Sequence, residues 1–425
     1  MLESLRKVWK TEELRKKIIY TFLMLLLYRV VSVIPAPGID KVSLLTATSA
    51  SNLPLLELVN MMTGNAFSQM TIMAMGITPY INASIIMQLL TIAIPALERM
   101  QNDESGQGRE KIARITRYVT VGLAALQAIG LVAGLGYVDK SSWLNYVLVG
   151  VSMAGGTALA MWIGERITDK GVGNGISLLI FVGIISNLFN GIVSGFSSAS
   201  TTSAVVNTVI VLAMAIIMTV LVTFVELGER RIPLNIAKQT RGRRVYGGQN
   251  TRMTLKVVSV GVLPLIFAYS FMAFPGTIIQ LVGGTNSGAY IWWSRYMNSS
   301  SPLYIIITAL LIIAFTFFYS SITFDARKQA EQLKMQGAVI TGMRGKNVYQ
   351  YLQNTVNRLN LFAALFLAVL SAVPSLLTRG LNTAVPFAAS SILIAVSVSL
   401  ETIRTIQGEM SIRGIEMDME KGGFM

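Results

Sequence analysis

The sequence of 425 residues contains no cysteine and no histidine, and each absence excludes a class of chemistry. Without cysteine the chain has no disulfide, no thiolate nucleophile and no cysteine metal site. Without histidine it lacks the usual general base and the commonest metal ligand, so a metalloprotease helix of the HExxH type is excluded. We therefore expect no catalytic residues, no metal and no cofactor.

Charge is also scarce, since 13% of the residues are charged and 53% are hydrophobic. Such a composition is typical of a polytopic membrane protein rather than a soluble domain. Ion-coupled transporters commonly need carboxylates near the bilayer midplane, but Glu165, Glu226 and Glu401 lie at the ends of apolar runs. Arg29 is the exception, and pairing or snorkelling is favoured over a functional role.

Nucleotide-binding motifs are missing as well. The sequence has no GxxxxGK[ST] loop, and GVGNG at Gly171–Gly175 lacks the strand-turn-helix context of a dinucleotide site. We interpret GVGNG as a tight turn. Any energy for work must therefore come from a partner or a gradient.

Ten apolar runs are long enough to predict membrane spans of about 20 residues each. They are Ile18–Ile34, Ile77–Ile94, Tyr118–Val138, Leu144–Ile163, Ile176–Phe196, Ala204–Val225, Val257–Val282, Leu303–Phe324, Leu359–Leu377 and Val385–Ile403. The runs divide five and five around a short uncharged loop, 197–203. With an odd number of spans in each half, any repeat must be inverted, and inverted halves frame a central cavity. We thus expect an N-terminal half 1–196, a hinge 197–203 and a C-terminal half 204–425.

The positive charges are distributed asymmetrically over the loops. Thirty of the 35 Lys and Arg fall before the first span, in alternate loops or in the tail, while the other loops hold only four. This asymmetry predicts that both termini are cytoplasmic. Two of the basic loops, 226–256 and 325–358, are longer than topology requires. They could simply enforce topology, but their length and tyrosines favour a docking surface for an acidic partner, with RNA as a further possibility.

The stretch from Asn60 to Pro95 is too long and too interrupted for one span. Its first part, 60–75, is rich in methionine but carries several polar residues, which makes it poor material for a lipid-facing helix. We predict a half-length helix at 60–75 that leads into a full span at Ile77–Ile94. Such an arrangement is typical of a pore or a binding cavity.

Over essentially its full length the sequence resembles the SecY family, the channel subunits of the bacterial protein-secretion translocon. The matching blocks are IPAPGID at 34–40, GITPYINASIIMQLL at 76–90, GVGNGISLLIF at 171–181, GERRIPLNIAKQTRGRRVYGGQ at 228–249, VLPLIFAYSFMAFP at 262–275 and GMRGK at 342–346. The resemblance implies an all-α polytopic membrane protein with ten transmembrane helices in two inverted pseudo-symmetric halves around an hourglass pore. It also implies a multi-pass location in the bacterial cytoplasmic (inner) membrane.

The resemblance assigns roles to two groups of residues in the pore. The 60–75 stretch would be a plug that folds into the pore from outside, represented by Asn60, Gly64, Phe67, Met70 and Met73. The constriction would be a ring of six isoleucines, namely Ile81, Ile85, Ile180, Ile184, Ile266 and Ile394. By spacing alone these isoleucines indicate no more than ordinary packing, because isoleucine is abundant throughout the chain.

The family also opens sideways, between spans two and three and spans seven and eight, to release hydrophobic segments into the lipid bilayer. Lateral-gate candidates are Ser84, Gln88, Gln127 and Phe274, for which helix-packing hydrogen bonds are an equal alternative. Docking candidates in the basic loops are Lys238, Arg243, Arg244 and Arg344, although Gly345 stands where the family often has proline. The implied partners are SecE, SecG, the SecA ATPase, the ribosome with its RNA, signal peptides and nascent chains.

We therefore predict a channel that conducts unfolded polypeptide and catalyses no reaction. A secondary transporter with broken helices is the alternative from another class, and midplane charge would favour it. A membrane-embedded enzyme is a weaker alternative, because it would need a histidine, a cysteine or paired carboxylates.

Overall fold

The computed structural model describes residues 9–39, 60, 63–101, 106–135, 143–197, 202–236, 239–241, 244–246, 250–261, 263–283, 287–297, 301–341, 347–381 and 389–413. Most of these residues are helical. The helices before the expected hinge are α2 (Glu12–Val31), α5 (Thr78–Ala93), α6 (Pro95–Gln101), α7 (Gln107–Leu135), α8 (Trp143–Lys170) and α9 (Gly175–Ser197). Those after it are α10 (Thr202–Glu226), α11 (Leu263–Gly283), α12 (Gly288–Tyr296), α13 (Pro302–Thr323), α14 (Ala326–Met335), α15 (Val348–Leu381) and α16 (Ala389–Ile412).

Each of the ten predicted spans coincides with one helix of the structure. In the described part of the chain, α7, α8, α9, α10, α13 and α15 are long and apolar enough to cross a membrane, and α5 with α6 would be a seventh if the bent pair is one span. The chain is thus a helical, multi-pass membrane protein. That α2, α11 and α16 also cross the membrane stays a prediction.

Several helix boundaries differ from the prediction, and two of the differences concern the connecting segments. Helix α11 begins at Leu263 rather than Val257, because turn residues precede it and Gly261 has a φ of +64°. The expected hinge 197–203 is shorter than predicted, because α9 extends to Ser197 and α10 begins at Thr202. Both helices therefore continue into the stretch that composition marked as linker.

The chain turns sharply after α5. The axes of α5 and α6 differ by 107° at Ile94, which is extended with φ −111° and ψ 110°. Pro95 explains the break, because the residue before a proline is disfavoured in the helical region. The predicted end of this span at Ile94 is therefore confirmed.

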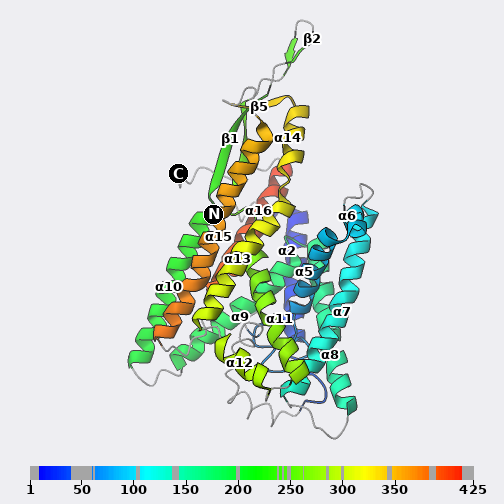
Figure 1. Ribbon diagram of the computed structural model, residues 1–425, viewed down its shortest axis with the longest axis vertical. Helices are drawn as coiled ribbons and strands as arrows, with labels where there is room; N and C mark the ends of the chain where they lie inside the picture. Colours follow the sequence, from blue (N-terminus) through cyan, green and yellow to red (C-terminus); the bar gives the residue numbers. More distant parts are fainter. Residues whose placement is uncertain are drawn as a thin grey trace.

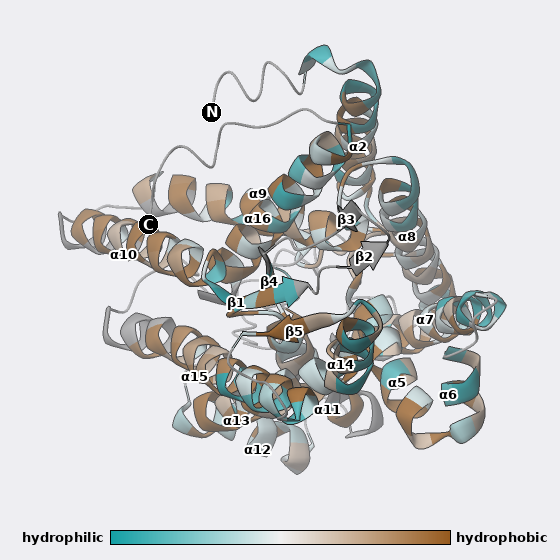
Figure 2. Cartoon of the chain, turned by 90° about the horizontal axis from the view of Figure 1, so that it is seen from above, coloured by the Kyte–Doolittle hydropathy of each residue, from teal (hydrophilic) through white to brown (hydrophobic). Residues whose placement is uncertain are grey.

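Five strands lie beyond one end of the helical bundle, which we call the strand end (Figure 1). They are β1 (Glu229–Ile236), β2 (Gln239–Arg241), β3 (Arg244–Tyr246), β4 (Asn250–Lys256) and β5 (Ala338–Ile340). Strands β4, β1 and β5 form an antiparallel sheet in that order, and β2 pairs with β3. Seen along the bundle, the sheet lies over its middle (Figure 2).

The two halves meet on two sides of the molecule. Helix α11 of the second half contacts α5 and α7 of the first, while α9 contacts α10 and α16. Between these contacts lies the largest cluster of buried hydrophobic side chains, to which both halves contribute. The core of the protein is therefore an interface between its halves.

Candidate functional site

The six isoleucines singled out in the sequence lie together in this central cluster. Ile81 and Ile85 come from α5, Ile180 and Ile184 from α9, Ile266 from α11 and Ile394 from α16. All are buried, and Ile85 is the most accessible at 6%. We call these six residues the isoleucine cluster.

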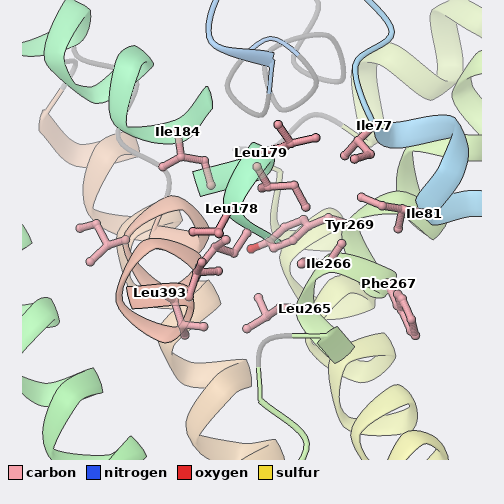
Figure 3. Close-up of a cluster of buried hydrophobic side chains, with 14 of the residues drawn as sticks. Ile77, Ile81, Leu178, Leu179, Ile184, Leu265, Ile266, Phe267, Tyr269 and Leu393 are labelled. Carbon is pink, nitrogen blue, oxygen red and sulfur yellow. The ribbon is translucent and has the colours of Figure 1, made fainter. Parts of the chain in front are cut away.

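Helical spacing explains how two helices each place a pair of side chains in the cluster. Residues four apart share one face of an α-helix, so Ile81 stands over Ile85 and Ile180 over Ile184. Figure 3 shows side chains of α5, α9, α11 and α16 directed toward a common interior, with Ile81, Ile184 and Ile266 among those labelled. Four helices that are far apart in sequence thus deliver the same aliphatic side chain to one place.

The large hydrophobic cluster that contains the six isoleucines continues into the segment that precedes α5. Ala66, Met73 and Ile77 belong to it, and Met73 has no accessible surface. Phe67 and Met70 of the same segment instead pack into a second cluster with α7 and α8. Of the expected plug side chains, Met73 therefore packs in the same large hydrophobic cluster as the six isoleucines, while Phe67 and Met70 attach the segment to the first half.

The structure corrects the prediction of a half-helix at 60–75. Asn60 and Thr63 are helical and Thr71 forms a β-bridge with Pro35, while the other described residues of this segment form turns. Gly64, Asn65 and Met70 have positive φ values of 64°, 71° and 45°. Such values are incompatible with a right-handed helix.

Side chains within the segment explain why it leaves the helical path. Asn60 donates from Nδ2 to Oδ1 of Asn65 at 2.9 Å, and its own Oδ1 accepts from the Ser68 backbone N–H at 3.0 Å. Thr63 Oγ1 accepts from the Phe67 N–H at 3.3 Å. These bonds compete with the helical ladder and satisfy polar groups that would otherwise be buried unpaired.

Arg29, the charge within the first span, connects three parts of the chain. Its Nη1 donates to the Gly64 carbonyl at 3.0 Å, and its Nη2 donates to the hydroxyl of Ser186 on α9. A β-carbon at position 64 would lie 2.6 Å from Nη1 and 3.1 Å from the carbonyl oxygen of Gly183. The pairing interpretation of Arg29 is therefore confirmed, and its partners are a backbone carbonyl and a hydroxyl.

A second close approach positions the other side of the segment. Gly156 of α8 lies so near the Ile72 backbone carbonyl that a β-carbon at position 156 would overlap it. Only glycine permits this approach. The 60–75 segment is thus held between Arg29 of α2 and Gly156 of α8.

The expected gate residues lie on helices that meet, since α11 contacts both α5 and α7. Gln127 of α7 is buried, whereas Ser84 and Gln88 of α5 are partly buried. Oε1 of Gln88 has no hydrogen-bond partner among the described residues. Phe274 belongs to α11, and its side chain lies outside the described part. The structure thus places the expected gate residues on helices that contact one another, and the gate assignment stays a prediction.

The two long basic loops form one folded unit, which the sequence did not reveal. Strand β5 of the second loop pairs with β1 of the first, with Leu234 opposite Ile340. A separate hydrophobic cluster lies beneath, and Ile232, Leu333 and Leu352 are among its members. We call this unit the platform.

The exposed face of the platform is basic. Arg231 and Arg252 are exposed on paired strands, with Arg231 opposite Thr254 and Arg252 opposite Pro233. Arg327 lies over the Tyr349 ring at 5.9 Å. Among the expected docking residues, Lys238, Arg243 and Arg344 lie outside the described residues, and Arg244 is in β3 with its side chain undescribed.

The turn at Gly171–Gly175 is confirmed. Gly173 has a φ of +77°, and Oδ1 of Asn174 accepts from the backbone N–H of Ile176 at 3.1 Å at the start of α9. The N–H of Val172 donates to Thr21 Oγ1 of α2 at 3.0 Å. The turn therefore orients α9, which carries two members of the isoleucine cluster.

Sequence comparison identifies the family. The SecY family profile matches residues 71–403, and a protein translocase subunit SecY from Streptomyces galbus is 38% identical over 98% of this chain and 99% of its own length. The chain belongs to the SecY family. Its members include a SecY from Escherichia coli strain K12, 36% identical over 97% of this chain and 95% of the relative.

Solved structures share the fold of this SecY-family chain. A SecY structure whose plug domain is described as stabilising the closed state of the translocation channel superposes with a TM-score of 0.68, at 19% identity and 95% coverage of both chains. Sec61 in the canine ribosome-channel complex gives a TM-score of 0.66 at 18% identity, again covering 95% of each chain. The architecture is therefore that of the SecY and Sec61 channels.

Proposed function

We propose that this SecY-family chain is a protein-conducting channel whose constriction is the isoleucine cluster and whose plug is the 60–75 segment. The observation that supports the proposal is that six isoleucines from four helices of both halves belong to one buried hydrophobic cluster between the halves. Translocation of polypeptide is the function of the family to which the chain belongs.

The chemistry of the cluster suits a passage for unfolded protein. Branched aliphatic groups offer no hydrogen bond or charge to a hydrated ion, so a narrow apolar constriction resists wetting. The same groups bind no particular substrate side chain, because they can contact any of them only through dispersion. A passing chain is therefore neither retained nor selected at the constriction.

Closure of the channel would involve the 60–75 segment. Met73 packs in the hydrophobic cluster that contains the isoleucines, Arg29 bonds to the Gly64 carbonyl, and Phe67 and Met70 pack against α7 and α8. Methionine is flexible and polarisable, which lets a stopper adapt to an irregular seat. Displacement of the segment would break the Arg29 bond and release Phe67 and Met70 from their packing against α7 and α8.

Lateral release would occur through separation of α11 from α5 and α7, which it contacts in this structure. Ser84, Gln88, Gln127 and Phe274 are the gate residues we propose. The unpaired Oε1 of Gln88 supports this role, because an unsatisfied polar atom weakens the contact it occupies. A gate has to open at low cost.

The platform would receive the partners that deliver substrate. Its basic exposed face suits acidic protein or RNA, and structural relatives include ribosome-bound channels. We propose Lys238, Arg243, Arg244 and Arg344 as contacts for SecA and the ribosome, with SecE and SecG as membrane partners. The platform and both termini would be cytoplasmic in a bacterial inner membrane, as the loop charges predict.

A cross-linking experiment tests the path of the substrate. The chain has no cysteine, so Ile85→Cys introduces a unique thiol. We expect it to cross-link to a stalled translocating polypeptide, because Ile85 belongs to the isoleucine cluster. Ile92→Cys on the same helix is the matched control, since Ile92 is 53% exposed on the outside of the bundle. Cross-links at position 92 but not at 85 would place the path elsewhere.

A further inference from the structure

Helix α12 is short, and like α6 it has no buried residue. It spans Gly288–Tyr296 between α11 and α13, at the end of the bundle opposite the strands (Figure 1). With nine residues it is too short to cross a bilayer, for which about 20 are needed. What surrounds its surface therefore depends on the side chains that it exposes.

The exposed face of α12 is mainly apolar and aromatic. Ile291 is 55% exposed, Trp292 51% and Tyr296 46%, and the rings of Trp292 and Tyr296 lie 5.4 Å apart. Arg295 is also exposed. In a helix, positions 291, 292, 295 and 296 lie on one side. The face thus combines a hydrophobic body with one positive charge.

Two serines hold α12 in a defined place next to a membrane span. Ser287 accepts the Tyr290 N–H at 3.2 Å and caps the start of α12. Ser301 donates to the carbonyl of Tyr296 at its end and accepts the Tyr304 N–H of α13 at 3.2 Å. Since α13 is long and apolar enough to cross the membrane, α12 ends directly beside the point where a span begins.

The apolar surface continues from α12 onto α13, where Leu303, Ile306 and Leu310 are 40%, 58% and 62% exposed. Exposed aliphatic side chains on a spanning helix contact lipid tails. Tryptophan and tyrosine are enriched where lipid tails meet headgroups, and a long arginine side chain can extend from an apolar surface to the headgroups. The position and the composition of α12 therefore both indicate the region where lipid tails meet headgroups.

We propose that α12 lies in the membrane interface, with Ile291, Trp292 and Tyr296 among the upper acyl chains and Arg295 at the lipid phosphates. The helix then anchors the adjoining ends of α11 and α13 to the bilayer surface. The partner is the lipid itself, not a second protein.

Spin labelling of the full-length chain in phosphatidylcholine vesicles tests the proposal. Ile291→Cys provides a single labelling site, and the accessibility of its nitroxide to oxygen is compared with that to a water-soluble nickel complex. The matched control is Glu331→Cys in α14, which is exposed at the strand end. We expect an oxygen-to-nickel accessibility ratio several-fold higher at 291 than at 331.

Two results would overturn the proposal. Equal nickel accessibility at both positions would mean that α12 is in water. Protection of position 291 from both reagents would mean that protein covers the face.

Quenching of Trp292 fluorescence by lipids brominated near the headgroup provides a second measurement, in a chain whose other tryptophans are replaced by phenylalanine. Absence of quenching there would likewise contradict an interfacial location.

Discussion

Arg29→Met is the substitution whose consequence follows most directly from the structure. Methionine keeps the length and apolar stem of the side chain but removes the guanidinium that donates to the Gly64 carbonyl at 3.0 Å. A hydrogen bond from a charged donor contributes about 1.5–3 kcal/mol, and partial exposure of Arg29 favours the lower figure. Since about 1.4 kcal/mol corresponds to a factor of ten, we expect the displaced state of the 60–75 segment to become about tenfold more populated.

Ion conductance through reconstituted channels without substrate measures this population, because displacement of the segment opens the path. Ser186→Ala is the matched control, since it removes the other Arg29 partner on α9 and leaves the Gly64 bond in place. We expect a clear rise in leak for Arg29→Met and a smaller one for Ser186→Ala. Thermal stability of the purified variants shows whether either change acts by unfolding.

Gly64→Ala perturbs the same contact from the other side. The new β-carbon would meet Nη1 of Arg29 at 2.6 Å at a residue with a φ of +64°, so the segment has to move. If both substitutions act on one contact, the double variant should leak less than the two single effects combined. Unchanged leak in Arg29→Met, or strict additivity in the double variant, would refute the idea that Arg29 holds the segment closed.

Two further predictions concern the isoleucine cluster and the platform. Ile180→Asn should raise the ion leak, because an amide lets water enter an apolar constriction, whereas Ile180→Leu should leave the seal intact; a normal seal in the asparagine variant would contradict a role at the constriction. Ile232→Ala removes a side chain that is 1% exposed and should cost the platform about 2–5 kcal/mol. Limited proteolysis should then cut both long loops faster, while exposed Arg231→Ala leaves them protected; faster cleavage of the first loop alone would show that the loops are independent.

The sequence determined the class of protein and its family. Hydropathy located ten runs that all coincide with helices, because a span in lipid has to satisfy its backbone within itself and therefore shows in local composition. Pro95 and the glycines of GVGNG also indicated their turns correctly, since these residues restrict or free the backbone locally. The candidate isoleucines came from the resemblance, as spacing could not separate them from ordinary packing.

Only the tertiary structure decided how these pieces meet. The half-helix predicted at 60–75 was wrong because hydrogen bonds of Asn60 and Thr63 with neighbouring groups outweigh helical propensity. The pairing of β1 with β5 joins loops about a hundred residues apart, which no local pattern reports. Likewise, the role of Arg29 follows only from its hydrogen bonds to Gly64 and Ser186. Contacts of this kind depend on which surfaces the fold brings together, and that is a property of packing rather than of composition.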